Sequence, residues 1–125
     1  MKPDQGDSTS ATRLALRISV ALVFAGTGLE KFSSDPTSYW VHVFAAIGLG
    51  QWFRYFTGVV ETVGGLLFLI PRATPLGAAL LTASMVGAMV VHIVVFKHPA
   101  DILFPGLYLV GVVLAYAKLR TPGAG

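Results

Sequence analysis

Glu61 is the residue whose type and position most clearly suggest chemistry in this 125-residue chain. It stands inside an apolar run, nine residues after Trp52, so at ~1.5 Å per residue it would lie about 13 Å deep in a membrane. An acidic residue at the centre of a spanning helix costs about 2.5–3.5 kcal/mol on insertion scales. We therefore expect Glu61 to face protein or a hydrated pocket. A buried carboxyl that only fixes helix packing is the alternative.

Two other ionisable residues, Lys31 and His92, are placed where they can reach Glu61. Lys31 ends the first apolar stretch, where it is either a boundary anchor or a partner whose stem reaches the neighbouring helix. His92 lies in the outer half of the third stretch, about one helical turn outward of Glu61 if the second and third helices are antiparallel. The three residues predict a ligand-binding or proton-relay site. No catalytic residue can be assigned, and the dispersed ligands do not predict a metal site.

Four glycines are expected to bring other helices close to this group. Three of them, Gly58, Gly64 and Gly65, lie three or four residues from Glu61 and share its helical face. Gly28 precedes Lys31 by three residues and provides the first helix with a similar face. Small residues allow membrane helices to approach closely, so these positions predict packing contacts.

The composition places the chain in a membrane. Hydrophobic residues make up 54% of it and charged residues only 12%, which is too little charge to cover a soluble domain of this size. The net charge of +3 then concerns membrane orientation and anionic lipid, because no basic stripe interleaved with aromatics indicates nucleic-acid binding. The chain has no cysteine, which excludes disulfides and thiol chemistry.

The elements that must position the site are helices, and the predicted fold is an all-α integral membrane four-helix bundle. Lipid cannot satisfy open backbone groups, and an apolar span needs roughly 20 residues. A short amphipathic helix, begun by Asp35 and Pro36 and ended near Gly48, is expected to lie at the interface between the first and second spans. The spans are expected at 14–32, 52–70, 73–96 and 102–119, within a membrane domain at 13–120 that is flanked by a disordered N-terminal tail at 1–12 and a C-terminal tail at 121–125.

The basic residues favour one orientation of this bundle. Four spans place both termini on the same side, and cytoplasmic termini agree with the positive-inside rule. In that orientation six basic residues lie inside and three lie outside: Lys2, Arg13, Arg17, Arg72, Lys118 and Arg120 against Lys31, Arg54 and Lys97.

Several short motifs resemble those of the DoxX family. They are Gly28-Leu29-Glu30-Lys31-Phe32 at the end of the first span, Glu61-Thr62-Val63-Gly64-Gly65 in the second, Arg72-Ala73 after it, and the late histidine of the third. The resemblance covers about residues 13–119 and implies a multi-pass protein of the bacterial inner membrane. It also implies that some relatives are subunits of quinone-linked sulfur oxidation or of membrane oxidoreductase assemblies. The motif residues carried over are Lys31, Glu61, Gly64, Gly65 and His92.

The expected function is that of a small subunit or accessory protein of a membrane redox system. It would bind a quinone or another hydrophobic small molecule between its helices, and would serve an oxidoreductase as an accessory rather than act as a self-sufficient enzyme. The sequence itself requires no cofactor, and the quinone is implied by the resemblance alone. The expected partners are the lipid bilayer and redox proteins, with no nucleic acid, and homo-oligomer formation is left open.

Two alternatives from other functional classes stay open. One is a small proton-coupled transporter of the four-helix multidrug type. The essential glutamate of such transporters lies in the first helix, whereas Glu61 lies in the second. The other is a non-catalytic membrane scaffold or assembly factor, in which the polar residues only lock the bundle.

Overall fold

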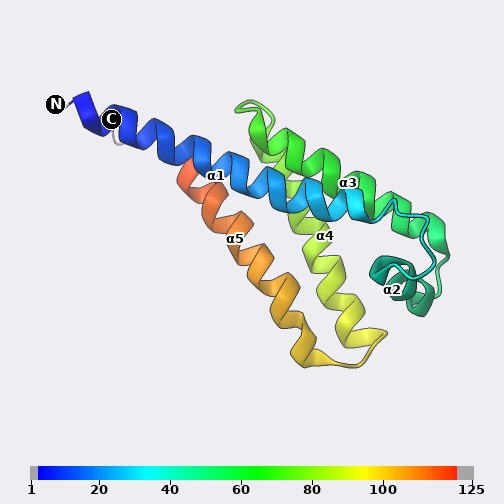
Figure 1. The fold of residues 1–125 in the computed structure, drawn as a ribbon. Coiled ribbons are helices and arrows are strands. Elements are labelled where there is room, and N and C mark those ends of the chain that lie inside the picture. The colour runs from blue at the N-terminus through cyan, green and yellow to red at the C-terminus, as the bar shows by residue number, and fades with distance from the viewer. Residues whose placement is uncertain (1–2, 121–125) are drawn as a thin grey trace.

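The described part of the chain, residues 3–120 of a computed structural model, is built of helices joined by short connections (Figure 1). The prediction of an all-α protein is therefore confirmed, and no strand occurs within these residues. The predicted C-terminal tail at 121–125 lies outside the described residues. The elements in chain order are α1 (Pro3–Glu30), α2 (Tyr39–Ile47), α3 (Gln51–Leu69), α4 (Thr74–Val94), the short 3-10 helix η1 (Pro99–Ile102) and α5 (Leu103–Arg120).

Three segments, rather than the expected four, are long and apolar enough to cross a membrane. They are Ser10–Glu30 in α1, Thr74–Val94, which is α4, and Pro99–Arg120, which joins η1 to α5. The expected second span at 52–70 forms α3, but α3 is not among them. Its polar residues Gln51, Arg54 and Glu61 lower its hydropathy, and the last two are buried against other parts of the protein. Three membrane-crossing helices are thus supported by length and composition.

Two helix starts differ from the expected positions. α1 begins at Pro3, so it extends through residues that we assigned to the N-terminal tail; proline fits a helix start, where no donor is needed. α2 begins at Tyr39 rather than at Pro36. Asp35 instead closes a local turn, since its Oδ1 accepts hydrogen bonds from the Thr37 backbone N–H at 2.9 Å and the Thr37 hydroxyl at 2.8 Å. These bonds hold the pKa of the exposed Asp35 carboxyl below its usual value.

α1 and α3 lie side by side and meet at backbone contact (Figure 1). A Cβ placed on Gly28 of α1 would lie 2.8 Å from the carbonyl oxygen of Gly58 in α3, and one on Gly65 would lie 3.0 Å from the backbone nitrogen of Ala25. Only residues without a side chain permit this approach. The contact fixes α3, and therefore Glu61, against the last turns of α1.

The core lies where α1, α3, α4 and α5 meet. Its fully buried side chains are Phe68 of α3, Leu81 of α4 and Val112 of α5. Many large apolar side chains point outward, including Leu22, 71% exposed, and Phe104, 67% exposed. Apolar surface on this scale is rare on soluble monomers and agrees with helices that face lipid.

Two arginines hold the helix ends together near the termini. Arg17 of α1 donates to the Phe68 carbonyl at the end of α3, at 3.0 Å, and to the hydroxyl of Thr74 at the start of α4. Arg13 donates to the Leu119 carbonyl in the last turn of α5, at 2.7 Å. Carbonyls at a helix C-terminus have no partner within the helix, so α1 supplies donors that the other helices lack.

Candidate binding cavity

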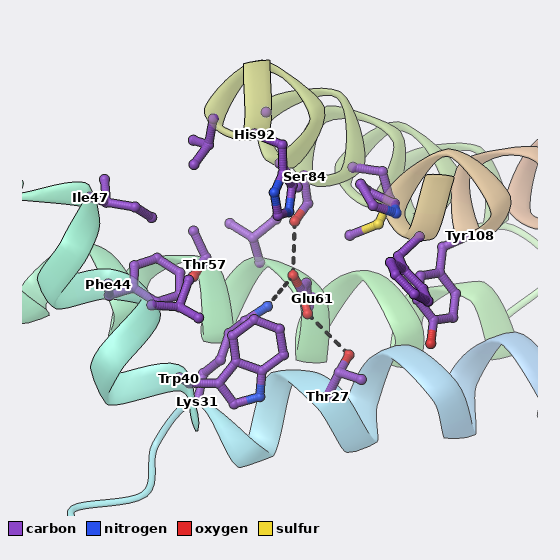
Figure 2. Close-up of a pocket in the computed structure, with 18 of the residues that line it drawn as sticks. Thr27, Lys31, Trp40, Phe44, Ile47, Thr57, Glu61, Ser84, His92 and Tyr108 are labelled. Carbon is purple, nitrogen blue, oxygen red and sulfur yellow. Dashed lines mark hydrogen bonds and ion pairs between the residues drawn. The ribbon is translucent and has the colours of Figure 1, made fainter. Parts of the chain in front are cut away.

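Glu61 of α3 sits at the centre of a polar network that also involves α1, α4 and Lys31, the residue that follows α1 (Figure 2). The residue is only 3% exposed. Its Oε1 accepts hydrogen bonds from Lys31 Nζ and, at 3.0 Å, from the hydroxyl of Ser84 in α4. Its Oε2 accepts a hydrogen bond from the hydroxyl of Thr27 in α1 at 3.1 Å. The carboxylate is thus held by donors on both of its oxygens.

Lys31 forms the buried ion pair with this carboxylate. Its side chain is 5% exposed, and its Nζ also lies 4.3 Å from the centre of the Trp40 ring in α2. Trp40 in turn donates from its indole nitrogen to Glu30 Oε2 at 3.2 Å. A buried charge needs a partner of opposite sign, and an aromatic face adds a weaker attraction. Lys31 therefore connects the α1–α3 contact to α2.

Arg54 is a second buried cation, and sequence reasoning missed its role. The sequence predicts only that Arg54 lies on the outer side, but the residue is 3% exposed and donates to the backbone carbonyls of Lys31 and Ser33, the latter at 2.7 Å. Its Nε also donates to Gln51 at 2.5 Å. These bonds hold in place the segment that follows α1 and begins with Lys31. The available signal was spacing, because Arg54 and Glu61 are two helical turns apart on one face of α3.

His92 of α4 lies about two helical turns after Ser84 on the same helix, and both residues line the cavity (Figure 2). Its ring packs against Phe96, with 5.4 Å between the ring centres. Its Nδ1 is buried and has no hydrogen-bond partner within residues 3–120. Such an unpaired buried atom costs free energy unless a ligand or water satisfies it.

A cavity of about 700 Å³ opens next to these groups, with walls from all five α-helices. Most of its surface is apolar, and α2 contributes Trp40, Phe44 and Ile47. The polar side chains on its wall include Glu61, Lys31 and His92, so the structure brings the three predicted residues to one cavity. Gly87 of α4 also lines it, and a Cβ there would meet no atom within 4 Å.

A model of the DoxX-like family matches residues 15–115. The chain belongs to the DoxX-like family. The match includes Lys31, Glu61 and His92, which line the cavity, and the buried Arg54.

One curated relative of this DoxX-like protein is named "Putative oxidoreductase CatD", from Bacillus subtilis (strain 168). The two are 29% identical over 77 residues, which cover 62% of this chain and 56% of the relative. The chain therefore matches little more than half the length of that protein. No solved structure matches the chain.

The geometry of the DoxX-like cavity suits an apolar ligand with a few polar atoms. Ligand sites are commonly clefts of about 300–1,000 Å³ with apolar walls and few polar groups, and this cavity falls within that range. Within the described residues, no three His, Cys, Asp or Glu side chains come together to hold a metal ion. The roles of Glu61, Lys31 and His92 in ligand binding or proton relay stay predictions.

A second orphan atom lies outside this cavity. Thr62 Oγ1 is buried without a hydrogen-bond partner within residues 3–120, but Thr62 faces Gly28 in the α1–α3 contact and does not line the cavity. Of the two orphan atoms, only His92 Nδ1 belongs to a residue that a cavity ligand can contact.

Proposed function

We propose that this DoxX-like protein binds a quinone in the cavity between its helices, as a small subunit or accessory protein of a membrane redox system. The observation that carries the proposal is an apolar cavity whose wall holds the Glu61 network and His92, a residue whose buried Nδ1 has no hydrogen-bond partner within residues 3–120. The oxidoreductase name of its relative supports the redox setting.

The cavity offers what a quinone requires. The ring is flat and apolar, and its carbonyl oxygens need hydrogen-bond donors. Trp40, Phe44 and Phe53 provide aromatic surface on one part of the wall, and aromatic rings pack favourably edge to face or offset. If the His92 ring turns so that its buried Nδ1 meets the ligand, the tautomer that carries the proton on Nδ1 donates a hydrogen bond to a ring carbonyl and pairs that atom.

Glu61 supplies the group that exchanges a proton beside the ring. A quinone takes up protons when it is reduced, and a carboxyl with neighbouring hydroxyls is suited to transfer them. The Ser84 hydroxyl lies 3.0 Å from Glu61 and the Thr27 hydroxyl 3.1 Å, so each is close enough to exchange a proton with that carboxyl. Lys31 balances the negative charge when the carboxyl is ionised.

The proposed setting is the inner membrane of a bacterium, with α3 as a fourth crossing helix. The polar groups that lower the hydropathy of α3, Arg54 and Glu61, face protein and are paired, so lipid need not solvate them. Both termini then lie in the cytoplasm.

Because the chain has no cysteine, single-cysteine variants report sidedness cleanly. The Ala73→Cys variant should resist a thiol reagent that is confined to the outside of cells, and the His98→Cys variant should react with it. The opposite pattern would reverse the orientation.

Quinone binding is tested by tryptophan fluorescence. Trp52 lies outside the cavity, so a Trp52→Phe protein leaves Trp40 as the only indole, on the cavity wall. Duroquinone, a tailless quinone, should quench it saturably. Gly87→Leu should abolish the quenching because the new side chain fills free space in the cavity.

Gly26→Leu is the matched control. Gly26 also has no atom within 4 Å of an added Cβ, but it does not line this cavity. Equal quenching in the parent and both leucine variants would refute the proposed site.

A further inference from the structure

A second cavity continues the first toward the outside of the bundle. It is a groove of about 260 Å³ between α1 and α5. Val23, Phe24 and Tyr108 line both cavities, so the groove and the main cavity are contiguous. The remaining residues of the groove are Leu16, Ser19, Val20, Leu107, Gly111, Val112 and Ala115.

The chemistry of the two cavities differs. The groove has no charged residue, and its only polar side chains are those of Ser19 and Tyr108. The main cavity, by contrast, is lined by the ionisable residues Lys31, Glu61, His92 and Asp101. Figure 2 shows Tyr108 on the side of Glu61 away from Trp40. A molecule that extends from Glu61 past Tyr108 thus passes from a polar to an apolar environment.

The groove is also open along its length. α1 and α5 are tied together by the bond from Arg13 to the Leu119 carbonyl, and their axes diverge from that end of α5 (Figure 1). A Cβ on Gly111 would meet no atom within 4 Å. At the junction, the buried ring of Phe24 meets the ring of Tyr108, which is 47% exposed, edge to face at 5.9 Å between centres.

We propose that the α1–α5 groove holds the hydrocarbon tail of the ligand whose quinone ring occupies the main cavity. The preferred ligand class is then a quinone with a long isoprenoid or alkyl tail, which enters sideways from the bilayer past Phe24 and Tyr108. This inference rests on the proposed function. Its basis is the continuity of a groove without charged residues with the cavity that holds the Glu61 network.

The experiment compares two quinones on the purified full chain in nanodiscs. Duroquinone has no tail, and decylbenzoquinone has a ten-carbon tail. Gly111→Leu adds a side chain to the groove at a position where a Cβ would meet no atom within 4 Å, and Ser19→Leu adds one from the opposite wall. Burial of one methylene changes affinity by about fourfold, so exclusion of two or more should weaken decylbenzoquinone at least about tenfold. Duroquinone should bind both variants as it binds the parent.

Gly106→Leu is the control on α5, because Gly106 has free space beside it but lines neither cavity. It should alter neither affinity, and membrane partitioning of the tailed quinone is the same for every variant. Equal effects of Gly111→Leu on both quinones, or no effect on either, would overturn the tail site while quinone binding stands.

Two further outcomes are distinct. If neither quinone binds the parent, the proposed function fails and the tail site with it. If Gly111→Leu instead lowers the amount of phospholipid that co-purifies, with no change for decylbenzoquinone, the groove holds a bilayer lipid and the proposal is wrong.

Discussion

α1 makes two contacts of opposite character with its neighbours. Against α3 it presents Gly28, where an added Cβ would lie 2.8 Å from the Gly58 carbonyl oxygen. Against α5 it presents Val20 and Val23, which border an open groove. The closed face fixes the position of the ion pair between Lys31 and Glu61, and the open face leaves room for a ligand next to it. A glycine whose added Cβ would clash, such as Gly28, thus marks where helices must touch, and the absence of such contact marks where the bundle admits another molecule.

Breaking the ion pair should cause the largest effect on the closed side. Lys31→Met leaves the Glu61 carboxylate buried without its counter-charge, which should cost about 3–5 kcal/mol of unfolding free energy. The double variant Lys31→Met/Glu61→Gln removes both charges and should recover most of that loss. Chemical unfolding in detergent, followed by circular dichroism, measures both. A double variant as unstable as Lys31→Met would show that the pair is not the source of the loss.

Crowding the closed face should have the next largest effect. Gly28→Leu must push α3 away and should cost about 1–3 kcal/mol or more. Gly26→Leu, on the same helix two residues earlier, meets no atom within 4 Å and should be nearly neutral. Thermal unfolding of the two proteins in the same detergent gives the comparison. Similar melting temperatures would mean that α1 and α3 do not meet at this glycine.

Removing the unpaired nitrogen of His92 should weaken quinone binding with little effect on stability. His92→Phe keeps a flat ring and eliminates the orphan Nδ1, so the ligand-free protein should be at least as stable as the parent. Quinone affinity should fall about tenfold, since a hydrogen bond of about 1–1.5 kcal/mol is lost. His92→Asn, which restores a donor, should recover part of the affinity. Unfolding curves and fluorescence titrations of the three proteins decide the matter. A loss of stability without a loss of affinity would make His92 a packing residue.

The positions of the helices could be predicted from hydropathy and turn residues. Pro75 lies in the first turn of α4, a position that suits proline, and Gly48, with φ of 84°, ends α2. The start of α2 could not be predicted, because Asp35 had two equally local uses, a helix cap and a turn, and the chain adopts the turn. Hydropathy also placed α3 among the spans without weighing how far its polar residues reduce the apolar signal.

The candidate site could be predicted in part. Glu61 was conspicuous because a lone carboxyl in an apolar run needs partners. Its partners Thr27 and Ser84 were not predictable as such, because hydroxyl groups are common in membrane helices and only the three-dimensional packing shows which of them reach it. Arg54 was missed for a different reason. Its position near a helix start is typical of an interfacial anchor, and only the fold reveals that the carbonyls after α1 surround it.

The central claim is that a quinone occupies the cavity with a ring carbonyl hydrogen-bonded to His92, and infrared difference spectroscopy tests it most directly. Duroquinone labelled with carbon-13 at its carbonyls would be added to the parent, to His92→Phe and to Gly87→Leu, the variant with a filled cavity. In the parent, one carbonyl band should shift to lower frequency than in apolar solvent, and His92→Phe should return that band to the solvent position. Gly87→Leu should show no bound quinone at all. A parent spectrum with both carbonyl bands at the solvent position, or a shifted band that persists in His92→Phe, would contradict the account.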